Sequence, residues 1–222
     1  MARKTARSAE PRIPLSRDRV LSAAIVLADD AGIEALSMRK LAQELGVEAM
    51  SLYNHVANKD DLLYGIVEAV AGEIVVPPGD AEWKTAIREI AISVHETLLR
   101  HPWASGLWMT RAKPGPGRMG YADSLLGALR GAGFSKDLTY HAFHILESYI
   151  LGYTVQVLSF RSLDARHVEG AASRFVRGDF AEEFPHLTEH ARQHMDPPGD
   201  GVSAYALGLD LILDGLERLR DE

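Results

Sequence analysis

The sequence contains no cysteine among its 222 residues. Disulfides, thiolate metal sites and cysteine nucleophiles are therefore excluded, and a reducing cytoplasm is the expected location. An apolar segment typical of a signal peptide is also missing near the N-terminus. The long weakly charged run 138–160 contains polar residues that lipid-facing helices rarely carry, namely His141, His144, Glu147 and Gln156. We therefore interpret this run as a buried helix and expect no membrane span.

The sequence also lacks common enzyme motifs: a glycine-rich phosphate loop, Gly-x-Ser-x-Gly and His-Glu-x-x-His. His144 and Glu147, one helical turn apart, are the pair that a helical enzyme would use for acid–base chemistry. We predict no catalytic residue and no cofactor, and we keep an enzyme only as an alternative hypothesis.

Charge is distributed unevenly along the chain. The net charge is −7, but residues 1–19 carry six basic and two acidic side chains, and the remainder has a net charge of −11. A basic arm on an acidic body is typical of a protein that meets a polyanion at one end. A solvated, disordered tail explains the same composition, so composition alone leaves both interpretations open.

Apolar residues recur at helical spacing throughout, and no alternation typical of a strand is found. The pattern predicts an all-α protein with a disordered basic tail at 1–15, a small helical unit at 16–76 and a larger helical domain at 80–222. Ser16, Ser37 and Asn58 are candidate helix N-caps. Further helices are expected from Asp80 to His101, near Tyr121–Arg130, at 135–161 and at 202–219, with a mobile Pro/Gly loop at 113–120.

The stretch from Met38 to Leu63 predicts a helix that breaks at Gly46 and resumes at once as a very short helix. Because so short a helix is not stable alone, it must pack against its neighbour. The residues expected to pack this corner are Leu41, Ala42, Val47 and Leu52. The outer polar side chains then stay free to enter a DNA major groove. This geometry predicts a helix-turn-helix that binds double-stranded DNA, although similar corners occur in proteins with no role on DNA.

The segments RKLAQELGV (39–47) and SLYNHVANKDDLL (51–63), preceded by DAGIEALSM (30–38), resemble the DNA-binding domain of the tetracycline-repressor (TetR) family over residues 16–65. The segments GFS (133–135), LGYTVQ (151–156) and YALGLDLILDGLE (205–217) resemble the ligand-binding domain of the tetracycline-repressor subgroup. The resemblance implies a transcriptional regulator, normally a repressor. Such a protein binds a palindromic operator as a two-fold homodimer and leaves it when a small molecule binds.

The resemblance also implies roles for individual residues on DNA. Arg39 matches a guanine-contacting arginine, and Lys59 matches a phosphate-contacting lysine at a helix start. Tyr53 and His55 match backbone-contacting positions, although partial burial of Tyr53 and a plain surface role for Lys59 are alternatives. The base-reading positions differ from those of the tetracycline repressor, so a different operator is expected; they are Ala49, Met50, Ser51 and Asn54.

The last helix, 202–219, has an apolar stripe too wide for one partner. Gly208 and Gly215 allow another helix to approach it closely. Helix 135–161 is similarly poor in charge, so the two helices predict a four-helix homodimer interface, as the resemblance also implies. An intramolecular bundle is the alternative.

The larger domain is expected to contain a cavity. If His141, His144, Glu147 and Gln156 are buried, lining a cavity gives these polar side chains a reason to be inside the domain. We expect a small apolar or aromatic effector, anchored by His144 and Glu147, unless these two form a self-satisfied buried pair. The residues expected to contact the effector are Val94, Trp103, Trp108, Arg111, Leu125, Tyr140, Phe143, His144, Glu147 and Gln156.

Metal is not expected in this site. The magnesium- and drug-binding side chains of the tetracycline repressor are replaced here by Val75, Leu107 and Gln156, so a tetracycline–magnesium complex is not the expected effector. Elsewhere, imidazoles at the spacing of one helical face can bind zinc or nickel, as for His186, His190 and His194. No fourth ligand is evident, so we interpret them as a solvated face.

Regulation requires a link between the cavity and the DNA-binding unit. We expect helix 58–76 to provide it, moved through the segment 103–111, with the loop 113–120 supplying freedom of movement. An unregulated architectural DNA-binding protein needs no cavity, so a polar-anchored cavity would discriminate against that alternative.

Overall fold

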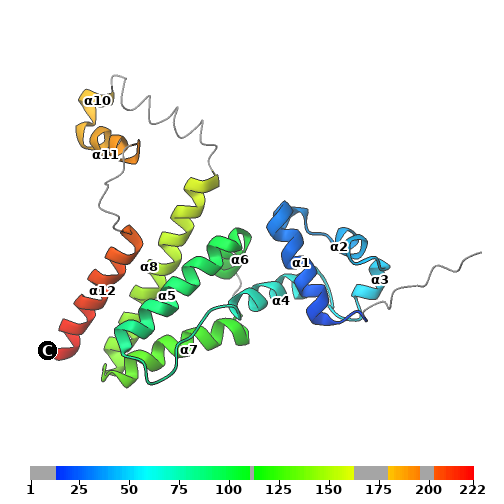
Figure 1. Ribbon diagram of the computed structural model, residues 1–222, viewed down its shortest axis with the longest axis horizontal. Coiled ribbons are helices and arrows are strands. Elements are labelled where there is room, and N and C mark those ends of the chain that lie inside the picture. Colours follow the sequence, from blue (N-terminus) through cyan, green and yellow to red (C-terminus); the bar gives the residue numbers. More distant parts are fainter. Residues whose placement is uncertain (1–13, 111–112, 163–179, 196–202) are drawn as a thin grey trace, which may run out of the picture.

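The computed structural model describes residues 14–110, 113–162, 180–195 and 203–222. Every regular element within these ranges is a helix, which confirms the predicted all-α class (Figure 1). The predicted basic tail, apart from its last two residues, lies outside the described residues. In the described part of the chain, no helix combines the length and the apolar character that crossing a membrane requires.

The N-terminal unit is built around one apolar cluster. Its elements are α1 (Arg17–Ala31), the short 3-10 helix η1 (Ile33–Ala35), α2 (Met38–Leu45), α3 (Ala49–Leu52) and the first half of α4 (Lys59–Ala71). The side chains of Ser16, Ser37 and Asn58 accept hydrogen bonds from backbone N–H groups in the first turns of α1, α2 and α4. The three predicted N-caps are therefore confirmed, and they fix where these helices begin.

The turn between α2 and α3 depends on Gly46, whose φ of 66° lies in the left-handed region. Leu41, Ala42 and Leu52 are buried at this corner, and Val47 packs against them half-buried, as predicted. The four residues of α3 are too few for an isolated helix. Its stability therefore comes from packing on one side, which leaves its other side exposed.

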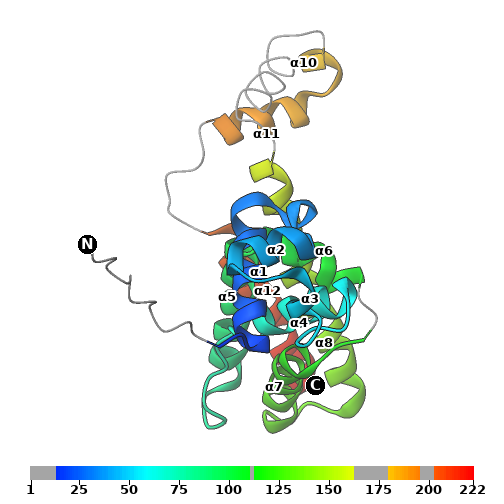
Figure 2. The same cartoon turned by 90° about the vertical axis from the view of Figure 1, so that its right-hand side faces the viewer.

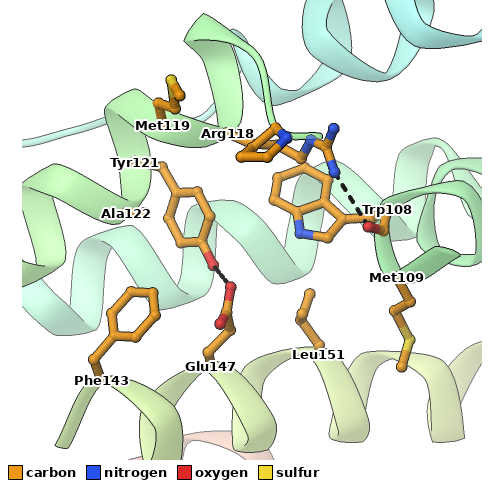
Figure 3. A pocket seen from close by; sticks show the side chains of 10 residues that line it. Trp108, Met109, Arg118, Met119, Tyr121, Ala122, Phe143, Glu147 and Leu151 are labelled. Carbon is orange, nitrogen blue, oxygen red and sulfur yellow. Dashed lines mark hydrogen bonds between the residues drawn. The ribbon is translucent and has the colours of Figure 1, made fainter. Parts of the chain in front are cut away.

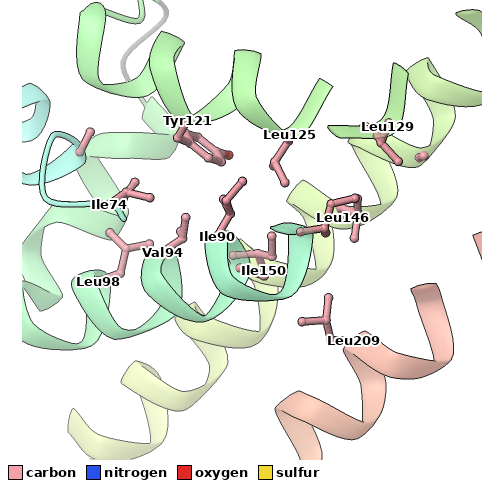
Figure 4. Packing of buried hydrophobic residues seen from close by; sticks show 14 of the residues in the cluster. Ile74, Ile90, Val94, Leu98, Tyr121, Leu125, Leu129, Leu146, Ile150 and Leu209 are labelled. Carbon is pink, nitrogen blue, oxygen red and sulfur yellow. The ribbon is translucent and has the colours of Figure 1, made fainter. Parts of the chain in front are cut away.

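A second apolar cluster forms the larger unit. It joins α5 (Trp83–Arg100), α6 (Pro102–Thr110), α7 (Pro116–Gly131), α8 (Lys136–Ser162) and α12 (Ala204–Asp221). Figure 4 shows Ile90 of α5, Leu125 of α7 and Ile150 of α8 converging between their helices. In Figure 1, α12 lies at the end of the molecule away from α2 and α3. The short helices α10 (Phe180–Glu183) and α11 (Pro185–Met195) stand apart from the others in both views (Figures 1 and 2).

Helix α4 belongs to both clusters. Leu62 and Ile66 are buried in the N-terminal cluster. Val67 and Val70, on an adjacent face of the same helix, are buried in the larger cluster. All four side chains are fully buried. A rotation or shift of α4 against the larger unit therefore displaces the N-terminal unit with it.

Two predicted helix boundaries in this region are wrong. α4 ends at Ala71 rather than near Ile74, because a glycine of low helix propensity follows. α5 begins at Trp83 rather than at Asp80, because the carboxylate of Glu82 accepts hydrogen bonds from the next N–H groups and caps the helix there. Residues 72–82 are consequently a connection without helix.

Helix α8 is buried on one face only. Ala142, Leu146 and Ile150 lie in the core at a spacing of four residues. His141, His144 and Gln156 point away from it and are exposed, so the predicted burial of these three side chains is wrong. The low charge of this helix therefore reflects an exposed side of mostly uncharged residues, among them Tyr140 and Ile145, rather than burial within the single chain.

A surface ion pair closes the N-terminal unit. Nη2 of Arg17, in the first turn of α1, lies 2.8 Å from Oδ1 of Asp61 in α4, and its Nη1 donates to the carbonyl of His55 at 2.8 Å. Asp61 also accepts the N–H of Ala57. The hydrogen bond from Arg17 holds the pKa of Asp61 below its usual value, aided by that N–H. The pair therefore joins the start of α1 to the end of the helix-turn-helix.

We expect Asp61→Asn to destabilise the protein by about 1 kcal/mol at pH 7, since the pair is partly exposed and screened by solvent. The pKa of Asp61 is lower in the folded than in the unfolded state, so its contribution is present above the unfolded pKa and is lost as pH falls through the folded pKa. The difference from wild type should therefore shrink below about pH 4. Urea unfolding at several pH values measures this, with the exposed Asp30→Asn as the control. An equal loss at pH 7 and pH 3 would contradict the interpretation.

Candidate functional site

The residues predicted to bind DNA lie on the short helix α3 and at the starts of α2 and α4. Arg39, Asn54 and Lys59 are exposed. Met50 is 74% exposed and Tyr53 44%, so Tyr53 is not buried beneath the corner. Ala49, Ser51 and His55 are partly buried. The structure thus presents most of these side chains to solvent at one end of the molecule, where α2 and α3 lie (Figure 1), and their roles on DNA stay a prediction.

A cavity of about 450 Å³ lies between α6, α7 and α8 in the larger unit (Figure 3). Phe143, Glu147 and Leu151 line it from α8, at a spacing of four residues that places them on one face of the helix. Trp108 and Met109 line it from α6. This face of α8 differs from the exposed face that carries His144 and Gln156.

The start of α7 supplies the opposite wall, with Arg118, Met119, Tyr121 and Ala122. The ring of Tyr121 lies 5.6 Å from that of Trp108 between centroids, tilted by 57°. Both aromatic side chains are nearly buried in the protein. The walls are therefore mainly aromatic and apolar, with a small number of polar groups, as is usual for small-molecule sites.

The first polar contact in the cavity is between Tyr121 and Glu147. The Tyr121 hydroxyl donates to Oε1 of Glu147 at 2.8 Å (Figure 3). Burial raises the pKa of the Tyr121 phenol, and the negative charge of Glu147 raises it further. The hydroxyl therefore stays protonated and acts as the donor to the carboxylate.

The second polar group of the cavity, Arg118, is tied to α4. Its Nε donates to Oε1 of Glu68 at 2.6 Å, and its backbone N–H donates to Oε2 of the same carboxylate at 3.2 Å. The remaining nitrogens donate to the carbonyls of Trp108, at 3.3 Å, and Lys113, at 2.7 Å. Burial alone would raise the pKa of Glu68, but these hydrogen bonds outweigh it and lower the pKa. Both groups therefore remain charged, and one lines the cavity while the other belongs to α4.

Glycines allow this approach of α7 to α4. A Cβ at Gly117 would overlap the backbone carbonyl oxygen of Glu68, and a Cβ at Gly115 would overlap the hydroxyl of Tyr64. The predicted loop 113–120 is therefore wrong from Pro116 onward, whereas its mobility stays a prediction. α7 begins at Pro116, because proline has the φ of a first helical turn and no N–H to satisfy there. The glycines serve close packing here rather than flexibility.

Three of the residues predicted to contact an effector line the cavity: Trp108, Phe143 and Glu147. Val94 and Leu125 are fully buried in the apolar core, outside the lining residues. Tyr140 and His144 were expected in the cavity, but they are exposed and contact each other on the outer face of α8. Gln156 is likewise exposed. Arg111 lies outside the described residues.

Trp103 lies between the two units rather than in the cavity. Its Nε1–H donates to Oδ1 of Asp29 in α1 at 2.6 Å. His101 Nδ1 lies 2.8 Å from the same oxygen, and His101 Nε2 lies 3.2 Å from Oε2 of Glu73. These contacts join α6 to α1 and to the chain after α4. The placement of Trp103 corrects its prediction as a wall of the cavity.

Sequence reasoning missed Arg118 and Tyr121, because both fall in or beside the segment interpreted as a loop. It also missed Leu151, although the repeat of four from Phe143 through Glu147 could have indicated it. In the helix α11, His186 and His190 are exposed, and His194 shares the helix. Among the side chains that the structure describes, no group of three His, Asp or Glu residues is arranged to hold a metal ion.

Two family models match the chain. The model of bacterial regulatory proteins, tetR family, matches residues 20–65, and the model of the tetracyclin repressor-like C-terminal domain matches residues 77–220. An HTH-type transcriptional regulator from Saccharopolyspora erythraea is 34% identical over 203 residues, which are 91% of this chain and 84% of that protein. The tetracycline repressor protein class D from Escherichia coli is 30% identical over 210 residues, 91% of this chain and 89% of that protein.

A solved structure supports the same relationship. The crystal structure of the Streptomyces coelicolor TetR family protein ActR in complex with actinorhodin matches with a TM-score of 0.76 and 27% identity. The match covers 95% of this chain and 100% of that one. The similarity therefore extends over both helical units.

The contact between α7 and α4 can be tested with two glycines of the same helix. We expect Gly117→Ala to destabilise the protein by about 1–3 kcal/mol, because the new Cβ overlaps backbone of α4 that cannot move independently. Gly120→Ala meets no atom within 4 Å and should instead stabilise by about 0.5–1 kcal/mol through helix propensity. Urea unfolding followed by circular dichroism measures both. Equal stability of the two variants would show that the close contact is absent.

Proposed function

Because the chain belongs to the TetR family of bacterial transcriptional regulators, we propose that it is a ligand-responsive repressor. In this proposal it binds a palindromic operator as a homodimer in the cytoplasm and leaves the operator when a small molecule fills the cavity between α6, α7 and α8. The observation that carries the proposal is that α4 packs in the helix-turn-helix unit and also holds, through Glu68, the cavity residue Arg118.

Recognition of DNA is assigned to the exposed side of α3 and the starts of α2 and α4. In this proposal Arg39 contacts guanine, because an exposed guanidinium can donate two hydrogen bonds to one base edge. Asn54 and Met50, both exposed, are proposed to read adenine and a thymine methyl group. Lys59, the first residue of α4, is proposed to bind phosphate, since the N–H groups at the start of that helix also favour an anion.

Homodimerisation is assigned to the uncovered faces of α8 and α12, in the predicted ranges 135–161 and 202–219. The exposed apolar side chains on these faces are Tyr140, Ile145, Phe160, Leu207, Leu211 and Leu219. Large apolar patches on a soluble protein mark interaction sites, and a two-fold axis lets one such patch cover its own copy. Two copies so joined would place two recognition helices on the two halves of a palindrome.

Regulation is assigned to the path from the cavity to α4. A ligand shifts a conformational equilibrium only if it binds one arrangement better than the other. In this proposal a molecule bound beside Trp108 and Arg118 favours an arrangement in which α7 or the Arg118 side chain has shifted. Either shift alters the hydrogen bonds between Arg118 and Glu68. It therefore alters the orientation of α4, and with it that of the helix-turn-helix unit, relative to the larger unit.

The alternatives fit less well. An unregulated architectural DNA-binding protein has no use for a cavity lined by Glu147 and by an arginine that is paired with a carboxylate of α4. A helical enzyme using His144 and Glu147 would need both at one site. His144 is exposed on the outer face of α8, while Glu147 faces the cavity and holds Tyr121. The relatives are also named as regulators and repressors.

Selection of operator sequences from a random DNA library tests the proposal. We expect enrichment of a palindrome, bound with a steep salt dependence. Arg39→Ala and Asn54→Ala should each weaken the selected operator by about 1–3 kcal/mol and relax specificity at one base pair per half-site. Lys59→Ala should weaken all sequences alike and reduce the salt slope.

Fluorescence anisotropy with the selected operator and single-base variants measures these effects. Glu34→Gln, an exposed substitution on η1, serves as a control for a change of charge in the same unit. Enrichment of no sequence would contradict the proposed function. Unchanged specificity of Arg39→Ala would contradict the assignment of that residue.

A further inference from the structure

We propose that the effector is an aromatic compound with a positively charged amine, bound with its ammonium group against Glu147 and its ring system between Trp108 and Phe143. This inference rests on the proposed function, because it names the chemical class of the molecule that fills the cavity. It goes beyond that function because it also specifies the charge of the effector, which the proposed function leaves open.

The first observation is that no basic side chain among the described residues pairs with the carboxylate of Glu147. A carboxylate can accept about four hydrogen bonds. Oε1 of Glu147 accepts one, from Tyr121 at 2.8 Å. In the part of the chain that the structure describes, no lysine, arginine or histidine forms an ion pair with Glu147. The carboxylate is therefore a ready acceptor for a cationic donor.

The second observation is that the charge of Arg118 is already balanced. Its side chain is 6% exposed, and its Nε lies 2.6 Å from Oε1 of Glu68, whose side chain is 10% exposed. The backbone carbonyls of Trp108 and Lys113 accept hydrogen bonds from its two Nη atoms. An anionic ligand would have to displace Glu68 from this arginine while lying near Glu147. A cationic ligand meets no such competition, since Glu68 and Arg118 together are neutral and Glu147 adds one negative charge.

The third observation concerns the walls. Trp108, Tyr121 and Phe143 bring three aromatic rings to the cavity, and the faces of such rings attract cations electrostatically. Met109 and Met119 lie at its edge, exposed by 63% and 57%, and their flexible side chains can adapt to different ring systems. A volume of about 450 Å³ is in the range that holds a drug-sized molecule.

The experiment uses three anthracene probes that differ in one group: 9-(aminomethyl)anthracene, 9-anthracenemethanol and 9-anthracenecarboxylate. Binding to the full-length protein without DNA is followed by probe fluorescence anisotropy and by isothermal titration calorimetry. We expect the amine to bind about tenfold more tightly than the alcohol, because a hydrogen bond to a charged partner is stronger than one between neutral groups. The carboxylate should bind most weakly.

Glu147→Gln should abolish the preference for the amine and leave the affinity for the alcohol nearly unchanged. Glu96→Gln, an exposed position on α5, removes the same charge outside the cavity and should keep the wild-type preference. Tyr121→Phe removes the hydrogen bond to Glu147 and should also keep the wild-type preference for the amine. Circular dichroism and thermal unfolding check that each variant folds.

Equal affinity of the three probes, absence of binding by all of them, or an unchanged preference in Glu147→Gln would each overturn the inference. These results do not depend on DNA. Failure of operator selection together with a preserved amine preference would contradict the proposed function alone. Successful selection with no amine preference would contradict this inference alone.

Discussion

The ion pair between Glu68 and Arg118 is the interaction on which the arrangement of the two helical units depends. A buried ion pair is tolerated only when the remaining donors and acceptors are also satisfied. Here the side chain of Arg118 donates hydrogen bonds to Glu68 and to two backbone carbonyls. The backbone N–H of Arg118 donates a further hydrogen bond to the carboxylate of Glu68. Glycines at 115 and 117 let the start of α7 come close enough to α4 for this set of bonds. Since α4 also fills both apolar cores, its position is fixed by packing on two sides and by the ion pair at the cavity.

This constraint connects the two ends of the proposed mechanism. The short helix α3 has little stability of its own, because it is four residues long, and it rests on a corner packed by Leu41 and Leu52. The helix-turn-helix shares its apolar cluster with α4 and therefore follows α4 as a unit, held also by Arg17 and Asp61. At the other end, the cavity is formed where α6, α7 and α8 meet, and α8 and α12 leave apolar faces uncovered. If those faces join two copies, a small change of angle at each α4 becomes a change in the distance between two recognition helices, which is the quantity that a palindromic operator reads.

Much of this architecture could be predicted from the sequence, because local rules determine it. The caps at Ser16, Ser37 and Asn58, the left-handed Gly46 and the packed corner follow from local chemistry and helical spacing. Trp108, Phe143 and Glu147 were correctly placed at a cavity, but Tyr140 and His144 were not, because the choice between the two faces of α8 depends on which helices cover it. Trp103 was misplaced because its partner, Asp29, is 74 residues away in the chain. Arg118 and Tyr121 were missed because a run of proline and glycine reads locally as a loop, whereas here it starts a helix and permits close packing. Long-range pairs of this kind leave no periodic signal in a single sequence.

The absence of cysteine allows a direct measurement of the coupling. A nitroxide at Glu44→Cys on α2 reports the distance between the two DNA-binding units of a dimer, and one at Arg218→Cys on α12 reports the dimer interface. Double electron–electron resonance should give one narrow distance distribution for each label in the otherwise wild-type protein. The combined change Glu68→Gln and Arg118→Met removes the ion pair without leaving a buried unpaired charge. It should broaden or shift the distribution of the α2 label and leave that of the α12 label unchanged. Unchanged distributions at both positions, or no measurable distance between copies, would contradict the account.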